Sequence, residues 1–182
     1  MLIHWAVVPT CLPIVNRRCH ACPSQRLRAS GKFRVNANHK LLDVWLLVLC
    51  TECGETAKLT VLERMTVRTI PPELLDRLHS NDGGLVAELL QDPAVQHRNR
   101  FALDWTDAWR LDTGGSEYLD LDVIDVAVRN AARVPVRPTR LIAEGCRLSR
   151  GEIDRLIMEG KVVSAFRLSG KLSGDFTFTL KH

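Results

Sequence analysis

Short apolar runs with a repeat of two residues dominate the first third of the chain. They cover residues 3–8, 32–36, 43–50 and 58–64, and the run over 43–50 ends at a cysteine. Because successive side chains of a strand point to opposite faces, this repeat predicts β-strands.

The repeat becomes helical after the two prolines at 71 and 72. Leu74, Leu75 and Leu78 would share one face of a helix over 73–79. The Asn-Asp-Gly-Gly sequence at 81–84 breaks this helix, a second is expected over 85–91, and Asp92-Pro93 begins a third. The middle of the chain is therefore predicted to consist of short helices.

Two further features of the middle segment have a structural and a chemical interpretation. Trp105 and Trp109 are four residues apart, so in a helix they would form one face, as core anchors or as a base-stacking pair. Asp120, Asp122 and Asp125 form an acidic cluster. The alternation from Leu119 to Val123 favours a strand with its acidic side in water over a carboxylate site.

The last third predicts a pair of helices followed by an extended segment. The first helix covers 139–145 and is expected to stop at Gly145. Ser149 with Glu152 three residues later forms a capping box, which starts a helix over 150–159. Gly160 ends that helix, and 161–163 is extended.

Two cysteine pairs carry the strongest chemical signal. Cys19 and Cys22 form one C-x-x-C turn, Cys50 and Cys53 form another, and 27 residues lie between them. Four thiolates from two tight turns make a tetrahedral site that suits one structural Zn²⁺ ion. Strands entering and leaving the two turns are typical of a zinc ribbon, and such a closed site leaves no position for a catalytic water.

Disulfide and redox roles are the alternatives to zinc. A redox C-x-x-C is typically a single pair in a βαβ setting, which this pattern lacks. The N-terminus has no secretory-signal pattern, and the longest apolar run is far shorter than a membrane span, so we expect a cytoplasmic protein with reduced thiols. Cys11 and Cys146 have no such partner and are expected to be small buried side chains.

Charge divides the chain into three parts. Residues 1–68 have a balance of +6, residues 69–128 of −8 and residues 129–182 of +6, which sum to the net charge of +4. Together with the patterns above, this predicts an α+β protein with a zinc-ribbon β domain over 1–68, an acidic, mainly helical segment over 69–128, and a basic module over 129–182. The basic ends could bind a polyanion, or the acidic middle could neutralise them within the fold.

The C-terminal helix pair resembles the alpha-L RNA-binding motif of ribosomal protein S-four, pseudouridine synthases and tyrosyl-tRNA synthetases. The resemblance rests on Arg140-Leu141, Leu148-Ser149-Arg150, Glu152-Ile153, Leu156-Ile157, Gly160 and Val162. It implies that basic side chains grip structured RNA, through Arg140, Arg147, Arg150, Arg155 and Lys161. The Val-Asn-Gly turn usual in that motif is missing after Val162. An ordinary capped helix pair packed on the core is the alternative.

The N-terminal part resembles an uncharacterised bacterial family, a domain of unknown function numbered ten-sixty-two. The resemblance rests on the two C-x-x-C pairs, the run over 32–38 and the sequence Asp-Val-Trp-Leu at 43–46. It implies a cytoplasmic bacterial protein and brings no activity with it. The polar residues Arg34, Asn36, Asn38 and Lys40 could form a binding face or hydrogen-bond the hairpin.

The sequence favours a non-catalytic zinc-binding protein associated with RNA or the ribosome. The chain has no Gly-rich phosphate loop, Ser/His/Asp arrangement or deaminase signature, so we expect no enzyme. A zinc-scaffolded protein-interaction or regulatory adaptor is the alternative. The sequence does not indicate an oligomeric state.

Overall fold

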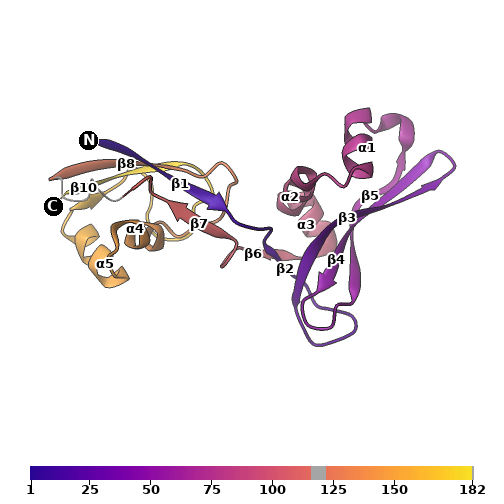
Figure 1. Cartoon of the computed structure of the whole chain (residues 1–182), viewed down its shortest axis with the longest axis horizontal. Helices are drawn as coiled ribbons and strands as arrows, with labels where there is room; N and C mark the ends of the chain where they lie inside the picture. Colours follow the sequence, from indigo (N-terminus) through magenta and orange to yellow (C-terminus); the bar gives the residue numbers. More distant parts are fainter. Residues whose placement is uncertain (116–121, 182) are drawn as a thin grey trace. The chain divides into compact units, whose positions relative to one another are not determined.

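The computed structural model describes residues 1–115 and 122–181, which form two compact units (Figure 1). The central unit is Leu12–Asp104. The terminal unit combines Met1–Cys11 with Trp105–His182. Each unit has a five-stranded sheet and helices, which confirms the α+β prediction.

The sheet of the central unit has the strand order β5-β4-β3-β2-β6, and all its pairs are antiparallel. The strands are β2 (Ile14–Asn16), β3 (Arg26–Asn38), β4 (Leu41–Cys50), β5 (Thr56–Thr66) and β6 (Ala102–Asp104). In β4, every second residue from Leu42 to Cys50 is buried, whereas the residues between them are half-buried. The sequence Leu-Leu-Asp-Val-Trp-Leu-Leu-Val-Leu-Cys therefore gives the sheet one inner, fully apolar face.

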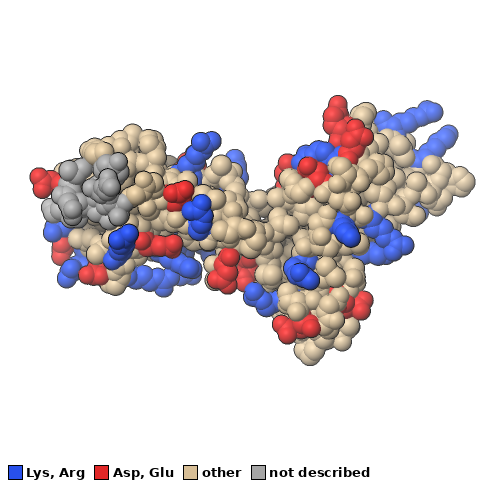
Figure 2. Space-filling model, viewed as in Figure 1, with Lys and Arg blue, Asp and Glu red and all other residues tan. Residues whose placement is uncertain are grey.

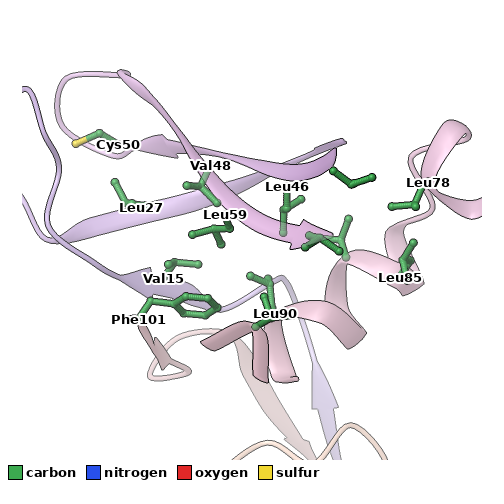
Figure 3. Close-up of a cluster of buried hydrophobic side chains, with 14 of the residues drawn as sticks. Val15, Leu27, Leu46, Val48, Cys50, Leu59, Leu78, Leu85, Leu90 and Phe101 are labelled. Carbon is green, nitrogen blue, oxygen red and sulfur yellow. The ribbon is translucent and has the colours of Figure 1, made fainter. Parts of the chain in front are cut away.

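Three short helices supply the other side of this core. They are α1 (Pro72–His79), α2 (Gly83–Gln91) and α3 (Pro93–Asn99), preceded by the 3₁₀ turn η1 (Val67–Thr69). Figure 3 shows Leu85 and Leu90 of α2 in one cluster with Leu46 and Leu59 of the strands. Asp82 starts α2 by accepting a 2.7 Å hydrogen bond from the Leu85 N–H.

One buried polar side chain closes the edge of this sheet. Asn99, at the end of α3, accepts from the Thr60 N–H at 2.7 Å and donates to the Thr60 carbonyl at 2.9 Å. Its amide also donates to the Val95 carbonyl at 2.9 Å. Asn99 therefore takes the place of a neighbouring strand beside β5, and it satisfies backbone groups that would otherwise be unpaired.

The sheet of the terminal unit has the order β7-β1-β8-β10-β9, with β1 parallel to β8 and the other pairs antiparallel. The strands are β1 (Leu2–Pro9), β7 (Trp109–Asp112), β8 (Val123–Arg129), β9 (Val162–Val163) and β10 (Phe176–Lys181). The helices are α4 (Pro138–Cys146) and α5 (Arg150–Met158). Trp5 of β1 is buried, makes an edge contact with Phe178 and packs against Gly145 of α4. Helix α4 thus lies against the inner face of this sheet.

The two units do not follow the segment boundaries at 68 and 128 that we drew from charge. The first strand leaves the expected ribbon domain and pairs with β8, and the helices of the acidic segment pack on the ribbon sheet instead of forming a domain. Residues 105–128 belong to the terminal unit. The physical reason is that burial of apolar faces, rather than net charge, decides which elements pack together.

The expectations for the tryptophan pair, the end of the first C-terminal helix and the acidic cluster had different outcomes. Trp105 is buried, but Trp109 is half-buried in strand β7, so the two do not share a helix face. Helix α4 continues through Gly145 to Cys146, and its C-cap residue Arg147 takes the left-handed conformation with φ 56°. Asp120 lies outside the described residues, and Asp125 is in β8, where it accepts a 2.6 Å hydrogen bond from the Thr179 hydroxyl. In the part of the chain that the structure describes, no helix is long and apolar enough to cross a membrane.

Candidate metal centre

The fold brings the four predicted cysteines together at one end of the central sheet. Cys19 and Cys22 lie in the loop between β2 and β3, Cys50 is the last residue of β4, and Cys53 lies in the turn before β5. The antiparallel pairing of Leu27 with Cys50 brings the first loop beside the second turn. The four Sγ atoms all lie within 4.8 Å of one another.

The spacing of the sulfurs fits a single tetrahedral ion. The Sγ atoms of Cys19 and Cys53 are 3.7 Å apart, and those of Cys22 and Cys50 are 3.6 Å apart. A tetrahedron with metal–sulfur bonds of about 2.3 Å has sulfur–sulfur edges of about 3.8 Å. A disulfide would need sulfurs about 2.05 Å apart, and all four cysteines are free thiols. The site could therefore hold a metal ion.

Backbone groups shape both turns around the sulfurs. The Ala21 N–H donates to Cys19 Sγ at 3.4 Å, and the Gly54 N–H donates to the Cys50 carbonyl at 3.1 Å. Gly54 has a φ of 73°, which is strained for any residue with a Cβ. A glycine after the second pair is thus required by the turn itself.

The thiols have unequal acidities. Backbone N–H groups of Cys53 and Glu52 lower the pKa of Cys50 to about 6, against the effect of burial. Although a backbone hydrogen bond with Ser24 favours the Cys22 thiolate, burial and the neighbouring thiols raise the pKa of Cys22 to about 12. Four adjacent thiols cannot all ionise alone, so full deprotonation of this cluster needs a bound cation.

The four-cysteine cluster is continuous with the hydrophobic core. Cys19 and Cys50 are buried within the same apolar cluster as Val15 and Leu27, whereas Cys53 is exposed. The centre therefore closes the end of the core where the strands would otherwise splay.

The remaining candidate ligands and thiols lie elsewhere. His20 lies near Glu55, with its Nε2 3.4 Å from the carboxylate, on the exposed side of the turn. Cys146 is half-buried, and burial raises its pKa to about 11, so it stays a neutral thiol. Cys11 is exposed, which contradicts the expectation of a buried side chain.

The structure spreads the five predicted nucleic-acid residues around the α4–α5 pair. Arg147 lies in the turn between the helices and Arg150 begins α5, and both are exposed. The guanidinium of Arg140 lies 5.9 Å from the centre of the Trp109 ring. Arg155 and Lys161 both approach Glu159, at 3.8 and 3.6 Å. The capping box between Ser149 and Glu152 is present as predicted.

Sequence reasoning named Arg34 as part of a possible binding face but missed the rest of one candidate surface on the central sheet. Trp45 lies on the face of β4 opposite the core, and the Nζ of Lys58 is 5.1 Å from its ring centre. The alternation around Trp45 was visible in the sequence. Which basic residues of the neighbouring strands lie beside it depends on the register, and a β-bulge between Ala29 and Phe33 sets that register.

Fold and site together define an α+β protein with a four-cysteine centre able to hold a metal ion. The chain belongs to the family described as "Protein of unknown function (DUF1062)", whose model matches residues 35–167. The matched region includes Cys50, Cys53 and the α4–α5 pair, and begins after Cys19 and Cys22. A search of the curated proteins found no match, and a search of the solved structures found none either.

Proposed function

We propose that this chain is a non-catalytic protein that holds one structural Zn²⁺ ion and binds structured RNA through the α4–α5 pair. The four-sulfur cluster supports zinc, because thiolates in tetrahedral geometry suit this ion and its sulfur spacing matches. Such a site is filled by protein ligands, so it leaves no coordination position for a reacting water.

The RNA-binding part rests on the exposed arginines around the turn from α4 to α5. Within residues 1–115 and 122–181, neither Arg147 nor Arg150 forms an ion pair, so both guanidinium groups are available to phosphates. The helix C-cap at Arg147 and the capping box of Ser149 and Glu152 fix the backbone of the turn through hydrogen bonds, so both arginines start from defined positions.

Binding of an RNA hairpin at several salt concentrations tests this proposal. We expect the double variant Arg147→Glu, Arg150→Glu to bind more weakly, with the slope of log affinity against log salt reduced by about two. The matched control is Arg129→Glu, Lys181→Glu. Both of these exposed residues follow buried ones, Val128 and Leu180, so they lie on the sheet face opposite the helices.

Two outcomes would contradict the proposal. One is hairpin binding that is absent or insensitive to salt in the wild type. The other is equal loss of binding in the α4–α5 variant and the control, since that would show a general charge effect. Circular dichroism must show that both variants remain folded.

A protein partner is the second candidate function, and an exposed apolar patch favours it. Met158 is 82% exposed, Val163 48% and Phe166 46%. Val163 and Phe166 line a hollow of about 570 Å³ beside α5, together with Ile157 and Leu168. Co-purification of one protein that resists nuclease and is lost in Met158→Ser, Phe166→Ser would favour this candidate.

A further inference from the structure

We infer that the outer face of β3–β5 in the central unit binds single-stranded nucleic acid, with Trp45 as the stacking platform. The outer face is the side of these strands opposite the apolar cluster of Figure 3, and its central residues are Arg28, Arg34, Trp45, Leu47, Leu49 and Lys58. This surface belongs to the other unit from the α4–α5 pair, and it does not rest on the RNA site proposed above.

Strand register places cations on both sides of an apolar row. Trp45, Leu47 and Leu49 follow one another along this face of β4, and all three are half-buried. On β3, Arg34 lies opposite Trp45 and Arg28 lies opposite Leu49. On β5, Lys58 lies opposite Leu47. Strands β3 and β5 flank β4, so their axes are about 10 Å apart. The arginines of β3 and Lys58 of β5 therefore lie on either side of the apolar row of β4.

The helices of the central unit leave this face uncovered. The apolar residues of α1–α3 belong to the cluster on the inner face, which contains Leu46 and Val48 of β4. A sheet face with an aromatic and aliphatic row is usually covered by another layer. Here Arg34 and Thr60 lie opposite Trp45 on the two neighbouring strands, and the Lys58 ammonium lies over its ring.

Charge is segregated between the two layers of the central unit. Strands β3–β5 carry six Lys and Arg residues and two Asp and Glu residues. Helices α1–α3 carry two basic and three acidic residues, and their N-cap residues Asp82 and Asp92 add two more carboxylates. Figure 2 shows basic side chains over β3–β5 and acidic ones over α1. Among the described residues, no ion pair joins an acidic residue of α1–α3 to a basic one of β3–β5. The sheet side therefore favours an anionic ligand.

The acidic side chain that β4 contributes to this face is already engaged. Asp43 lies opposite Asn36 in the register, and its carboxylate accepts a 2.8 Å hydrogen bond from the Arg64 N–H. This contact directs the Asp43 carboxylate toward the backbone of β5. Asp43 also lies near the opposite end of β4 from Leu49, the residue that faces Arg28. Within the described part of the chain, Arg28, Arg34 and Lys58 form no ion pair with a carboxylate.

Single-stranded nucleic acid fits this arrangement better than a duplex. Its bases expose their flat faces, and an aromatic ring flanked by cations can stack one base while the cations contact the adjacent phosphates. In a duplex the bases are stacked on each other, so only the phosphates would be recognised and Trp45 would contribute nothing. The Lys58 ammonium over the ring can move to a phosphate when a base takes its place.

The test is fluorescence anisotropy with labelled twelve-nucleotide single strands of RNA and of DNA, using the full zinc-loaded chain. Trp45→Leu keeps an apolar side chain and removes the ring, so we expect binding to weaken roughly 5- to 150-fold. Trp45→Phe keeps a ring and should retain most of the affinity. Arg34→Glu, Lys58→Glu should weaken binding and reduce its salt dependence.

Matched controls separate this site from the one in the terminal unit. Arg147→Glu, Arg150→Glu should leave single-strand binding unchanged, whereas Trp45→Leu should leave hairpin binding unchanged. Inorganic polyphosphate carries the charge without bases and should compete poorly. The affinities for the RNA and the DNA single strand show whether the surface prefers ribose or deoxyribose.

The inference is overturned if the wild type binds no single strand. It is also overturned if Trp45→Leu, folded and loaded with one zinc ion, binds as tightly as the wild type. The basic neighbours would then only cover the apolar row of β4, and the ring of Trp45 would have no part in binding. If Trp45→Leu fails to fold, Trp45→Phe is compared with the double variant Arg34→Glu, Lys58→Glu. Unchanged single-strand binding in this double variant refutes the site.

Discussion

Substitution of Gly145 by alanine tests the packing that positions the α4–α5 pair. Gly145 lies inside α4, and a Cβ added there would be 2.3, 2.4 and 2.9 Å from three ring carbons of Trp5. Carbon atoms in favourable contact are about 3.5–4.0 Å apart. The helix or the indole must therefore move by about 1 Å or more.

The expected loss of stability follows from two opposing effects. Trp5 is only 2% exposed and packs edge-on against Phe178, with ring centres 5.4 Å apart, so its ring has little room to move. Overpacking of this kind costs about 1–3 kcal/mol, and the three simultaneous clashes place it near the upper end. Alanine regains about 1 kcal/mol of helix propensity over glycine. We expect a net destabilisation of about 2 kcal/mol.

Gly151→Ala is the matched control, because a Cβ at this position in α5 would meet nothing within 4 Å. It should stabilise the terminal unit by about 0.5–1 kcal/mol. In a unit of this size 1 kcal/mol shifts Tm by about 4–8 °C. We therefore expect Tm to fall by about 8–16 °C for Gly145→Ala and to rise by a few degrees for Gly151→Ala.

Thermal unfolding followed by circular dichroism, with hydrogen exchange to assign the change to the terminal unit, measures this difference. A double-mutant cycle sharpens the test: Trp5→Phe removes the ring that carries the three clashing carbons, so Gly145→Ala should cost less in that background. Equal costs in both backgrounds, or a Gly145→Ala protein as stable as the wild type, would refute the packing argument.

Three further predictions concern the metal centre, the sheet edge and the capping box. Elemental analysis should find one zinc ion per chain, and its loss in Cys50→Ser or with a chelator should unfold the central unit while hydrogen exchange in the terminal unit stays slow. Asn99→Ala leaves both backbone groups of Thr60 without their partner, so it should destabilise the central unit by about 2 kcal/mol or more and speed exchange of the Thr60 amide; unchanged exchange would contradict this. The hydrogen bonds with Ser149 hold the pKa of Glu152 below its ordinary value of 4.5. The ionised carboxylate therefore adds stability above that pH, and this stability is lost as the pH falls through the lower pKa of the folded state. The free energy of unfolding of the wild type should therefore exceed that of Glu152→Gln by less in acid than at neutral pH. A difference between the two proteins that does not change with pH would show that the charge plays no part.

Local signals in the sequence predicted the local structure well. Two C-x-x-C pairs predicted the sulfur cluster, because each tight turn presents two thiols in one direction. The alternation over 43–50 predicted β4, and the Ser149–Glu152 spacing predicted the start of α5. Each of these features depends only on neighbours within a few residues.

Gly145 illustrates where local reasoning failed. A glycine near a helix end is commonly its stop signal, yet here the helix continues and Arg147 takes the left-handed position. The glycine is needed because Trp5, 140 residues earlier in the chain, occupies the space of a Cβ. No pattern near Gly145 contains that information.

The sequence by itself determined the α+β class, the strands of the central sheet next to the cysteine turns and the four cysteines of the cluster, since these follow from local periodicity and from spacing within turns. Only the tertiary structure decided that β1 pairs with β8, that the acidic helices cover the ribbon sheet, and that Arg34 and Lys58 lie beside Trp45. These outcomes depend on which apolar faces cover each other and on the register between distant strands. A one-residue slip in that register would turn every one of these side chains to the other face of the sheet.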